Sequence, residues 1–450
     1  MRKINDKGYG PPLNVVRHLW LVAVGSAMLL LGARAEARAN IRQSDSTLVV
    51  REVQVLGNET TNESVILREM RLRPGERVTP EAVEHDRQRV YNLRLFNRVD
   101  VEIVPEANSE ATVFVIVHER LYFFPYPILG FKYRDVKNFY YGLGLTHQNL
   151  AGRNEKLYFS FALGYDRWVK LEYQDPRLTS DDLFWGIGAG ASRYQNLSPQ
   201  LGSYHQRGVW GYVTFGKRFG LYKNLSLRLD YEVVQVPPEI TNGTVSPTGR
   251  DAFPTASITF THDSRDLSEY ATKGTLAKGY VSKSGVSGNG VDFFRYGVDA
   301  CGYIPVFDGA ALGVRSFASL TGGPVVPPYK YLYFGYNERI RGHFNTISEG
   351  ENIIGATTEL RIPIISPRHY TFPYAIIPEL SVWRYGVFVS IFADAGKTWF
   401  RAEGFEGRLW QAGVGASVDL LLPYSIVVRG ACALGDGGNT EVILDFGTAF

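Results

Sequence analysis

The sequence predicts a mainly β protein in which a transmembrane antiparallel β-barrel of about sixteen strands follows one small α+β domain. The composition is rich in Gly (47), Tyr (27) and Phe (26), yet mean hydropathy is only −0.12. From about residue 122, apolar and polar side chains alternate in segments of about ten residues, the length that a tilted strand needs to cross a bilayer. After residue 40 no apolar run is long enough for a transmembrane helix, so a spanning structure must be a closed barrel.

Residues 1–39 have the three parts of a secretory signal peptide. Basic residues precede an apolar stretch from Leu19 to Leu31, and small residues with A-x-A spacing follow between Ala33 and Ala39. The apolar stretch is short for a membrane span, which favours a cleaved signal over the alternative, an N-terminal anchor helix. We therefore expect an exported chain that begins near Asn40.

Residues 46–120 predict a small domain with the order strand, helix, helix, strand, strand. Gly57-Asn58 ends the first strand, and apolar residues at helical spacing predict the first helix from Asn62 to Leu72. Thr79-Pro80 places an N-cap and a proline at the start of the second helix. This order, together with the helix-to-strand junction at residues 95–101, resembles the POTRA domain of outer-membrane assembly and secretion barrels. A generic α+β domain is the alternative. The resemblance implies a periplasmic module that binds extended polypeptide by adding a strand to a sheet edge.

Residues 122–450 form the expected barrel, and their last segment ends on an aromatic residue. Val442, Leu444, Phe446 and Phe450 share one face of that segment, so the terminal ring is expected to face lipid. A last strand of this kind resembles the signal by which outer-membrane barrels are recognised for assembly.

Three further segments resemble the BamA/TamA-type assembly superfamily, also called the bacterial surface antigen family. The first is a strand-turn motif with Asp263, Arg265 and Asp266, and the second is an F-x-D-x-G strand motif around Asp394. The third is a hydrophobic-Arg-Gly-aromatic signature in a long loop that, in the family, folds back into the lumen. Here Ile340, Arg341 and Gly342 match it, but His343 stands at the aromatic position and Phe344 one place later.

An arginine placed in a lumen must find carboxylates, because an unpaired buried charge is very costly. The alternation around Glu359 and around Asp394 turns both side chains inward. We therefore expect Arg341 to reach Asp394 or Glu359; an exposed loop arginine is the alternative.

The resemblance implies an assembly or translocation factor that assists insertion or transport of polypeptides at the outer membrane. Its expected partners are outer-membrane lipids, unfolded outer-membrane or secreted polypeptides, and periplasmic chaperones or assembly partners. In the family a weakly paired seam joins the first strand, here near Pro127–Tyr133, to the last, where Gly447 loosens pairing. A single POTRA-like domain favours an accessory member. The alternative is a polypeptide-translocating pore or a passive channel on the same scaffold.

The sequence offers no support for catalysis. The eight histidines have no metal-ligand spacing, and the glycine pattern at 186–191 lies in a strand and not before a helix, so no metal, nucleotide or other cofactor is expected. The net charge of +3 gives no reason to expect nucleic-acid binding. Cys301 and Cys432 lie in distant strand patterns, which favours unpaired small core residues over a disulfide.

Overall fold

The computed structural model describes residues 48–179, 181–286, 290–307, 309–335, 338–343 and 346–446. The expected signal peptide (1–39) lies outside these ranges, as do Phe344, Gly447 and Phe450. None of the helices in the described ranges is long and apolar enough to cross a membrane.

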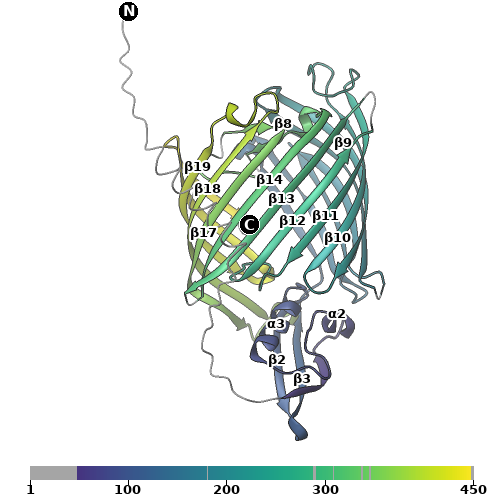
Figure 1. Ribbon diagram of the computed structural model, residues 1–450, viewed down its shortest axis with the longest axis vertical. Coiled ribbons are helices and arrows are strands. Elements are labelled where there is room, and N and C mark those ends of the chain that lie inside the picture. The colour runs from purple at the N-terminus through teal and green to yellow at the C-terminus, as the bar shows by residue number, and fades with distance from the viewer. Residues whose placement is uncertain are drawn as a thin grey trace, which may run out of the picture. The chain divides into compact units, whose positions relative to one another are not determined.

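A small three-stranded domain begins the described chain and has the predicted order of elements (Figure 1). Its elements are β1 (Val49–Leu56), α2 (Glu63–Leu67), α3 (Pro80–Tyr91), β2 (Phe96–Pro105) and β3 (Glu110–Glu119). β3 lies in the centre of the sheet, parallel to β1 and antiparallel to β2. The two helices close a core that includes Val50, Ile66, Val90, Phe96 and Val113.

The first helix of this domain is shorter than the sequence predicted. Apolar spacing predicted a helix from Asn62 to Leu72, but α2 ends at Leu67. The backbone N–H groups of Arg71 and Leu72 instead donate to the carboxylate of Asp86 on α3, at 2.8–3.0 Å. A side chain of the second helix therefore binds the groups that a longer first helix would have used.

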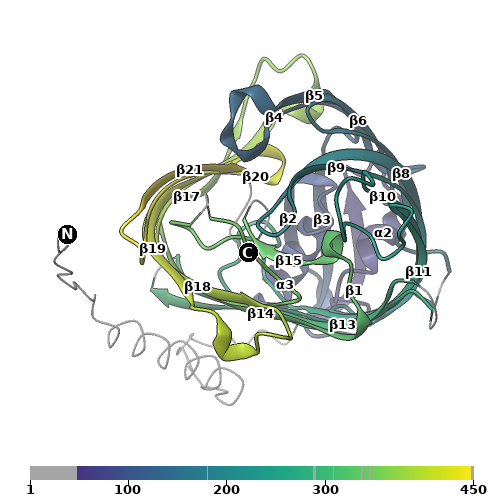
Figure 2. The same ribbon diagram turned by 90° about the horizontal axis from the view of Figure 1, so that it is seen from above.

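The rest of the chain forms one sixteen-stranded antiparallel sheet that curves into a barrel (Figures 1 and 2). Each strand pairs with the next along the chain, except that β14 pairs with β17 across a long loop that holds the short hairpin β15–β16. The strands are β4 (Phe123–Phe131), β5 (Phe139–Leu150), β6 (Glu155–Gly164), β7 (Arg167–Asp175), β8 (Leu183–Ser198), β9 (Gly202–Phe219), β10 (Lys223–Gln235), β11 (Arg250–Asp263), β12 (Gly274–Ser284), β13 (Asp292–Phe307), β14 (Ala310–Val325), β15 (Leu332–Phe334), β16 (Ser348–Gly350), β17 (Asn352–Thr371), β18 (Val382–Trp399), β19 (Gln411–Leu422), β20 (Ile426–Gly435) and β21 (Thr440–Phe446).

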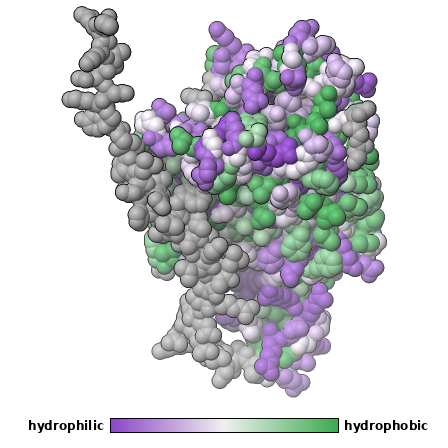
Figure 3. All heavy atoms as spheres, turned by 45° about the horizontal axis from the view of Figure 1, so that its top comes forward, coloured by the Kyte–Doolittle hydropathy of each residue, from purple (hydrophilic) through white to green (hydrophobic). Residues whose placement is uncertain are grey.

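The strands alternate as the sequence predicted. On β10, for example, Leu225, Leu227 and Leu229 are exposed on the outer face, while the residues between them point into the lumen. Hydrophobic residues accordingly gather on the barrel wall, and hydrophilic ones dominate its upper end (Figure 3). Because β4 leads out of the small domain and the strands alternate in direction, the turns on the same side as that domain are those after β5, β7, β9, β11, β13, β17 and β19.

Two details of the sequence interpretation were wrong. The first barrel strand was expected near Pro127–Tyr133, but β4 ends at Phe131, and Tyr133 takes a left-handed φ of 55° in a 3-10 turn. Cys301 and Cys432 are both unpaired, yet only Cys301 is buried; Cys432 lies on the outer face of β20 and not in a core.

Candidate functional site: a lumen charge cluster and an unpaired seam

Arg341 lies in the barrel lumen and contacts both carboxylates that the sequence put forward. Its guanidinium donates to Asp394 through Nε and Nη2, each at 2.7 Å, and through Nη1 to Glu359 at 3.1 Å. Its backbone N–H also donates to Asp394, at 3.1 Å, and the guanidinium carbon lies 3.4 Å from the ring centre of Phe392. The planar fork therefore meets two acceptors and an aromatic face at once.

Glu359 is the hub of a wider cluster. Besides Arg341, it accepts hydrogen bonds from Arg361 at 2.8 Å and from both Nη atoms of Arg429 at 2.9 and 3.0 Å. Arg429 also binds Asp419 at 2.8 and 2.9 Å. Three arginines thus balance three carboxylates, and all six side chains are buried. A neutral and hydrogen-bonded group of this kind is the form in which buried charges are tolerated.

The turn between β11 and β12, on the side of the small domain, also contacts this cluster. Tyr270, between β11 and β12, donates its hydroxyl to Asp419 at 2.9 Å and packs on Phe388 with ring centres 4.3 Å apart. Arg361 lies over the Tyr270 ring, 4.6 Å from its centre. The lumen cluster therefore joins strands β17 to β20, the long loop and this turn.

The strand-turn motif shapes that turn. Arg265 donates two hydrogen bonds, of 2.9 and 3.0 Å, to the carboxylate of Asp263. Asp266 accepts hydrogen bonds from the backbone N–H groups of Leu267 and Thr272. Asn92, at the end of α3, donates to the carbonyl of Asp266 at 2.8 Å. The motif thus fixes a turn that contacts both the small domain and, through Tyr270, the lumen cluster.

The loop backbone lies very close to β19 and β20, which sequence reasoning missed. A Cβ on Gly413 would stand 1.9 Å from the carbonyl oxygen of Arg341, and one on Gly435 would stand 2.7 Å from that of Gly342. Gly342 itself has φ 94°, a conformation that favours glycine. His343 approaches the carbonyl of Ala412 with Nε2 at 3.0 Å. His343, which stands where the family signature has an aromatic residue, therefore packs its imidazole against β19.

We expect Gly413→Ala to displace the loop from the lumen. The added Cβ would clash with the backbone carbonyl oxygen of Arg341, which cannot move aside as a flexible side chain could. Trypsin added outside proteoliposomes should then cleave after Arg339 or Arg341, with fragments identified by mass spectrometry. Gly430→Ala is the matched control, since nothing lies within 4 Å of the Cβ that it would add. Equal resistance of the two variants to trypsin would contradict this packing.

The same loop also binds the last strand. The N–H of Gly342 donates to the Glu441 carboxylate at 2.8 Å, and Arg339 forms an ion pair with Asp445. Both acidic residues belong to β21. The loop therefore fixes one edge of the barrel seam.

β4 and β21 are the two ends of the sixteen-strand order, and among the described residues no backbone ladder joins them. Their outward side chains are more exposed than most on the barrel wall: Leu129 is 68% exposed, and Val442, Leu444 and Phe446 are 69–78% exposed. Of the C-terminal residues expected at the seam, Phe446, Gly447 and Phe450, the structure describes Phe446, which lies on the edge of β21 opposite β20.

Two prolines shape the seam edge of β4. Gln148 donates its N–H to the carbonyl of Tyr122, so even-numbered residues of β4 direct their backbone groups to β5 and odd-numbered residues direct theirs to the seam. Pro125 and Pro127 are odd-numbered and have no N–H. The periplasmic half of this edge therefore offers carbonyl acceptors at these two positions and no donors.

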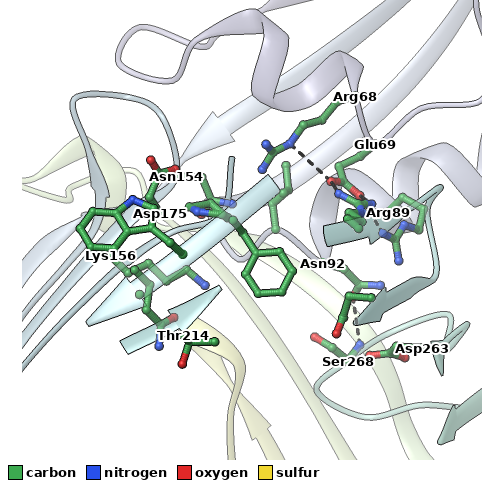
Figure 4. A pocket seen from close by; sticks show the side chains of 18 of the residues that line it. Arg68, Glu69, Arg89, Asn92, Asn154, Lys156, Asp175, Thr214, Asp263 and Ser268 are labelled. Atoms are coloured by element: carbon green, nitrogen blue, oxygen red, sulfur yellow. Dashed lines mark hydrogen bonds and ion pairs between the residues drawn. The ribbon is translucent and has the colours of Figure 1, made fainter. Parts of the chain in front are cut away.

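A second polar cluster lies at the periplasmic end of the lumen, where small-domain and barrel residues line a cavity of about 570 Å³ (Figure 4). Glu69, which is buried, accepts hydrogen bonds from Arg89 and from Arg218 of β9, each at 2.7 Å. Burial raises the pKa of Glu69, but the hydrogen bonds and charges of the two arginines outweigh burial and hold that pKa below its usual range.

The contact of Glu69 with Arg89 and Arg218 is expected to persist from neutral pH to about pH 5 and to weaken below about pH 4. A carboxyl whose pKa is lowered in the folded protein stabilises the fold at pH values above its ordinary pKa. That stabilisation is lost as the pH falls towards the pKa of the folded state.

Because both arginines retain contact with water, we expect the contact of Glu69 with Arg89 and Arg218 to contribute about 1 kcal/mol to stability. Glu69→Gln should therefore speed trypsin cleavage after Arg68 or Arg71 at pH 7. Glu84→Gln, which removes an exposed pair with Arg87, should leave cleavage unchanged.

No group of three or more His, Cys, Asp or Glu side chains in the described part of the chain is arranged to hold a metal ion.

Comparison with known proteins places this geometry in a family. The model of the Omp85 superfamily domain matches residues 149–428, and that of the POTRA domain, the surface antigen variable number repeat, matches residues 48–120. Outer membrane protein assembly factor BamA of Nitratidesulfovibrio vulgaris is 26% identical over 339 residues, 71% of this chain. The same factor of Neorickettsia risticii is 25% identical over 273 residues, 58% of this chain. The chain spans 42% and 36% of the lengths of these two relatives.

Two solved structures have a similar fold. BamA from Haemophilus ducreyi lacking POTRA domains 1–3 has a TM-score of 0.54 at 18% identity, over 89% of this chain and 84% of that one. CdiB from Escherichia coli has a TM-score of 0.55 at 11% identity, over 89% of this chain and 75% of that one.

Proposed function

The chain belongs to the Omp85 superfamily, and from this membership and its seam we propose that it assists the insertion of unfolded β-barrel polypeptides into the outer membrane. The barrel lies in the bacterial outer membrane, and its POTRA domain lies in the periplasm. The curated relatives are named as assembly factors. The clients are unfolded outer-membrane or secreted polypeptides, delivered by periplasmic chaperones or assembly partners. The role is accessory and involves neither catalysis nor a cofactor.

The observation that carries this proposal is the seam between β4 and β21, where no backbone ladder joins the two strands among the described residues. In lipid, unpaired backbone N–H and C=O groups have no water to bind, so an open edge is costly and favours pairing with another strand. A client strand supplies the missing groups. The loop of Arg341 contributes by holding β21 in place through Glu441 and Asp445.

The test is reconstitution of the full chain into liposomes with an unfolded barrel protein as client. The client's folding, followed by its resistance to heat in gel electrophoresis, is expected to be faster than in empty liposomes. It should be slower with Arg341→Ala than with the wild type. Unchanged client folding together with solute or ion flux through the barrel would replace this proposal by the passive channel.

A further inference from the structure

Two strands continue well beyond the barrel wall. The last residue of β17 that pairs with β14 is Arg361, and the first residue of β18 that pairs with β19 is Gly386. In the described chain, residues 364–385 therefore form a two-stranded ribbon that projects past the rim on the periplasmic side. We call these residues the projecting ribbon.

The outer face of the projecting ribbon continues the lipid-facing surface of the barrel. On β18, Trp383 and Tyr385 follow the same alternation as Val387, Val389 and Ile391 of the barrel wall. Their cross-strand neighbours, which share a face with them, are Tyr370 and Arg368. Trp383 and Tyr370 are about half exposed. An aromatic face thus extends, without a break in the pattern, from the surface that contacts lipid.

The opposite face is polar and contacts protein. It carries Arg384 and, across the ribbon, His369. Arg384 forms an ion pair with Glu269 of the turn between β11 and β12, and its guanidinium lies 5.1 Å from the ring centre of Tyr91 in the POTRA domain. The ribbon is therefore amphipathic, with its polar face held inward and its aromatic face outward.

The depth of these rings fits the boundary between hydrocarbon and water. Trp383 lies three residues beyond Gly386, about 10 Å along a strand at about 3.3 Å per residue. With a tilt of about 45°, this is about 7 Å along the membrane normal, similar to the thickness of a headgroup layer. Trp and Tyr are the residues enriched at that level.

We propose that the outer face of the projecting ribbon binds the periplasmic leaflet of the outer membrane and lies in its phospholipid headgroup layer. Trp383, Tyr385 and Tyr370 insert their rings between headgroups and upper acyl chains. Arg368 lies among them and extends its guanidinium to a phosphate.

The edges of the ribbon disfavour the other obvious occupant, an added β-strand. On β17, Pro363 directly precedes the ribbon and Pro367 lies within it, and the register shifts twice, between Pro363 and Ile365 and between Ile365 and Arg368. Prolines and bulges on an unpaired edge block the ladder that an incoming strand requires. Contact with lipid requires no such ladder.

The tip of the ribbon is built to hold apolar side chains outward. Phe372 donates its N–H to Ser381 at 2.7 Å, and Trp383 donates its ring N–H to the carbonyl of Leu380 at 2.6 Å. Between these contacts, Tyr374 is 83% exposed and Ile376 is 99% exposed. These tip residues lie at least five residues beyond Gly386, and therefore farther from the barrel rim than the three rings.

The test measures where the aromatic face of the ribbon lies in a bilayer. Tyr370→Cys and, separately, Tyr385→Cys are made in the full chain with Cys301→Ala and Cys432→Ala, and are labelled with an NBD fluorophore. The proteins are reconstituted in vesicles of phosphatidylethanolamine and phosphatidylglycerol. Quenching by brominated phospholipid reports contact with the bilayer, and quenching by iodide reports contact with water. Heat-modified mobility in gels verifies that each barrel is folded.

The chain provides matched controls. Leu409→Cys, in an extracellular loop, and Leu178→Cys, in another periplasmic turn, are 91% and 53% exposed and should be quenched by iodide. Native Cys432, labelled in the Cys301→Ala chain, faces lipid and should be quenched by the brominated lipid.

The proposal predicts at least threefold stronger bromolipid quenching at positions 370 and 385 than at 178 and 409, with correspondingly weaker iodide quenching. Iodide quenching equal to that at 409 would overturn it, because the aromatic face would then lie in water. Protection from both quenchers would also overturn it, because protein would then cover this face.

Discussion

Arg341→Ala is expected to destabilise the folded barrel by about 3–5 kcal/mol and to release the long loop from the lumen. The substitution removes the three hydrogen bonds that the guanidinium donates to Asp394 and Glu359, and leaves only the one from the backbone N–H to Asp394. It also leaves the other five members of the buried cluster with an excess negative charge. The measurement is the temperature at which the folded form is lost in gel electrophoresis, combined with trypsin cleavage of the loop.

Arg401→Ala is the matched control for this variant. Arg401 also binds a carboxylate across a loop, that of Glu351 at 2.8 Å, but it lies at the surface. Its loss should therefore cost at most about 1 kcal/mol. Arg341→Lys should fall between the two, because it keeps the charge but loses the fork that meets Asp394 twice. If Arg341→Ala and Arg401→Ala melt at the same temperature, the lumen cluster does not stabilise the barrel.

Much of this site could be predicted from the sequence because strand alternation is local. The period of two around Glu359 and Asp394 is sufficient to turn both side chains inward, and the structure places both against Arg341. The same reasoning extends to Arg429, whose neighbours Val428 and Gly430 face away from the lumen, but the sequence analysis did not apply it there. The alternation was a usable signal for that residue.

The remaining members of the site depend on relations between distant segments. Glu359 and Arg429 are 70 residues apart, and no local pattern indicates that their strands bring them to one level. Tyr270 comes from a turn whose path into the lumen depends on the fold of the turn itself. Gly413 and Gly435 matter only because the loop backbone lies against them. Register and loop path are properties of the assembled barrel, so single-strand periodicity does not reveal them.

The double variant Pro125→Val/Pro127→Val is expected to tighten the seam and slow client folding. Each valine returns an N–H to the edge of β4 that faces β21. On β21, Gly435 donates to Asn439, so residues 440, 442, 444 and 446 direct their carbonyls to the same seam. Two new hydrogen bonds at about 0.5–1.5 kcal/mol each shift the opening equilibrium by about 5- to 150-fold.

Two readouts separate this effect from a general gain in stability. Amide hydrogen exchange of residues 440–446 should slow in the double variant, and the liposome assay should show slower client folding. Pro254→Val is the matched control, because Pro254 lies in the paired strand β11, away from the seam, and its carbonyl accepts from Gly285. Valine suits positions 125 and 127, whose side chains are exposed on the outer face.

If hydrogen exchange slows but client folding does not, the seam closes without being the edge on which clients fold, and insertion must use another part of the barrel. If neither changes, β4 and β21 do not meet in the membrane.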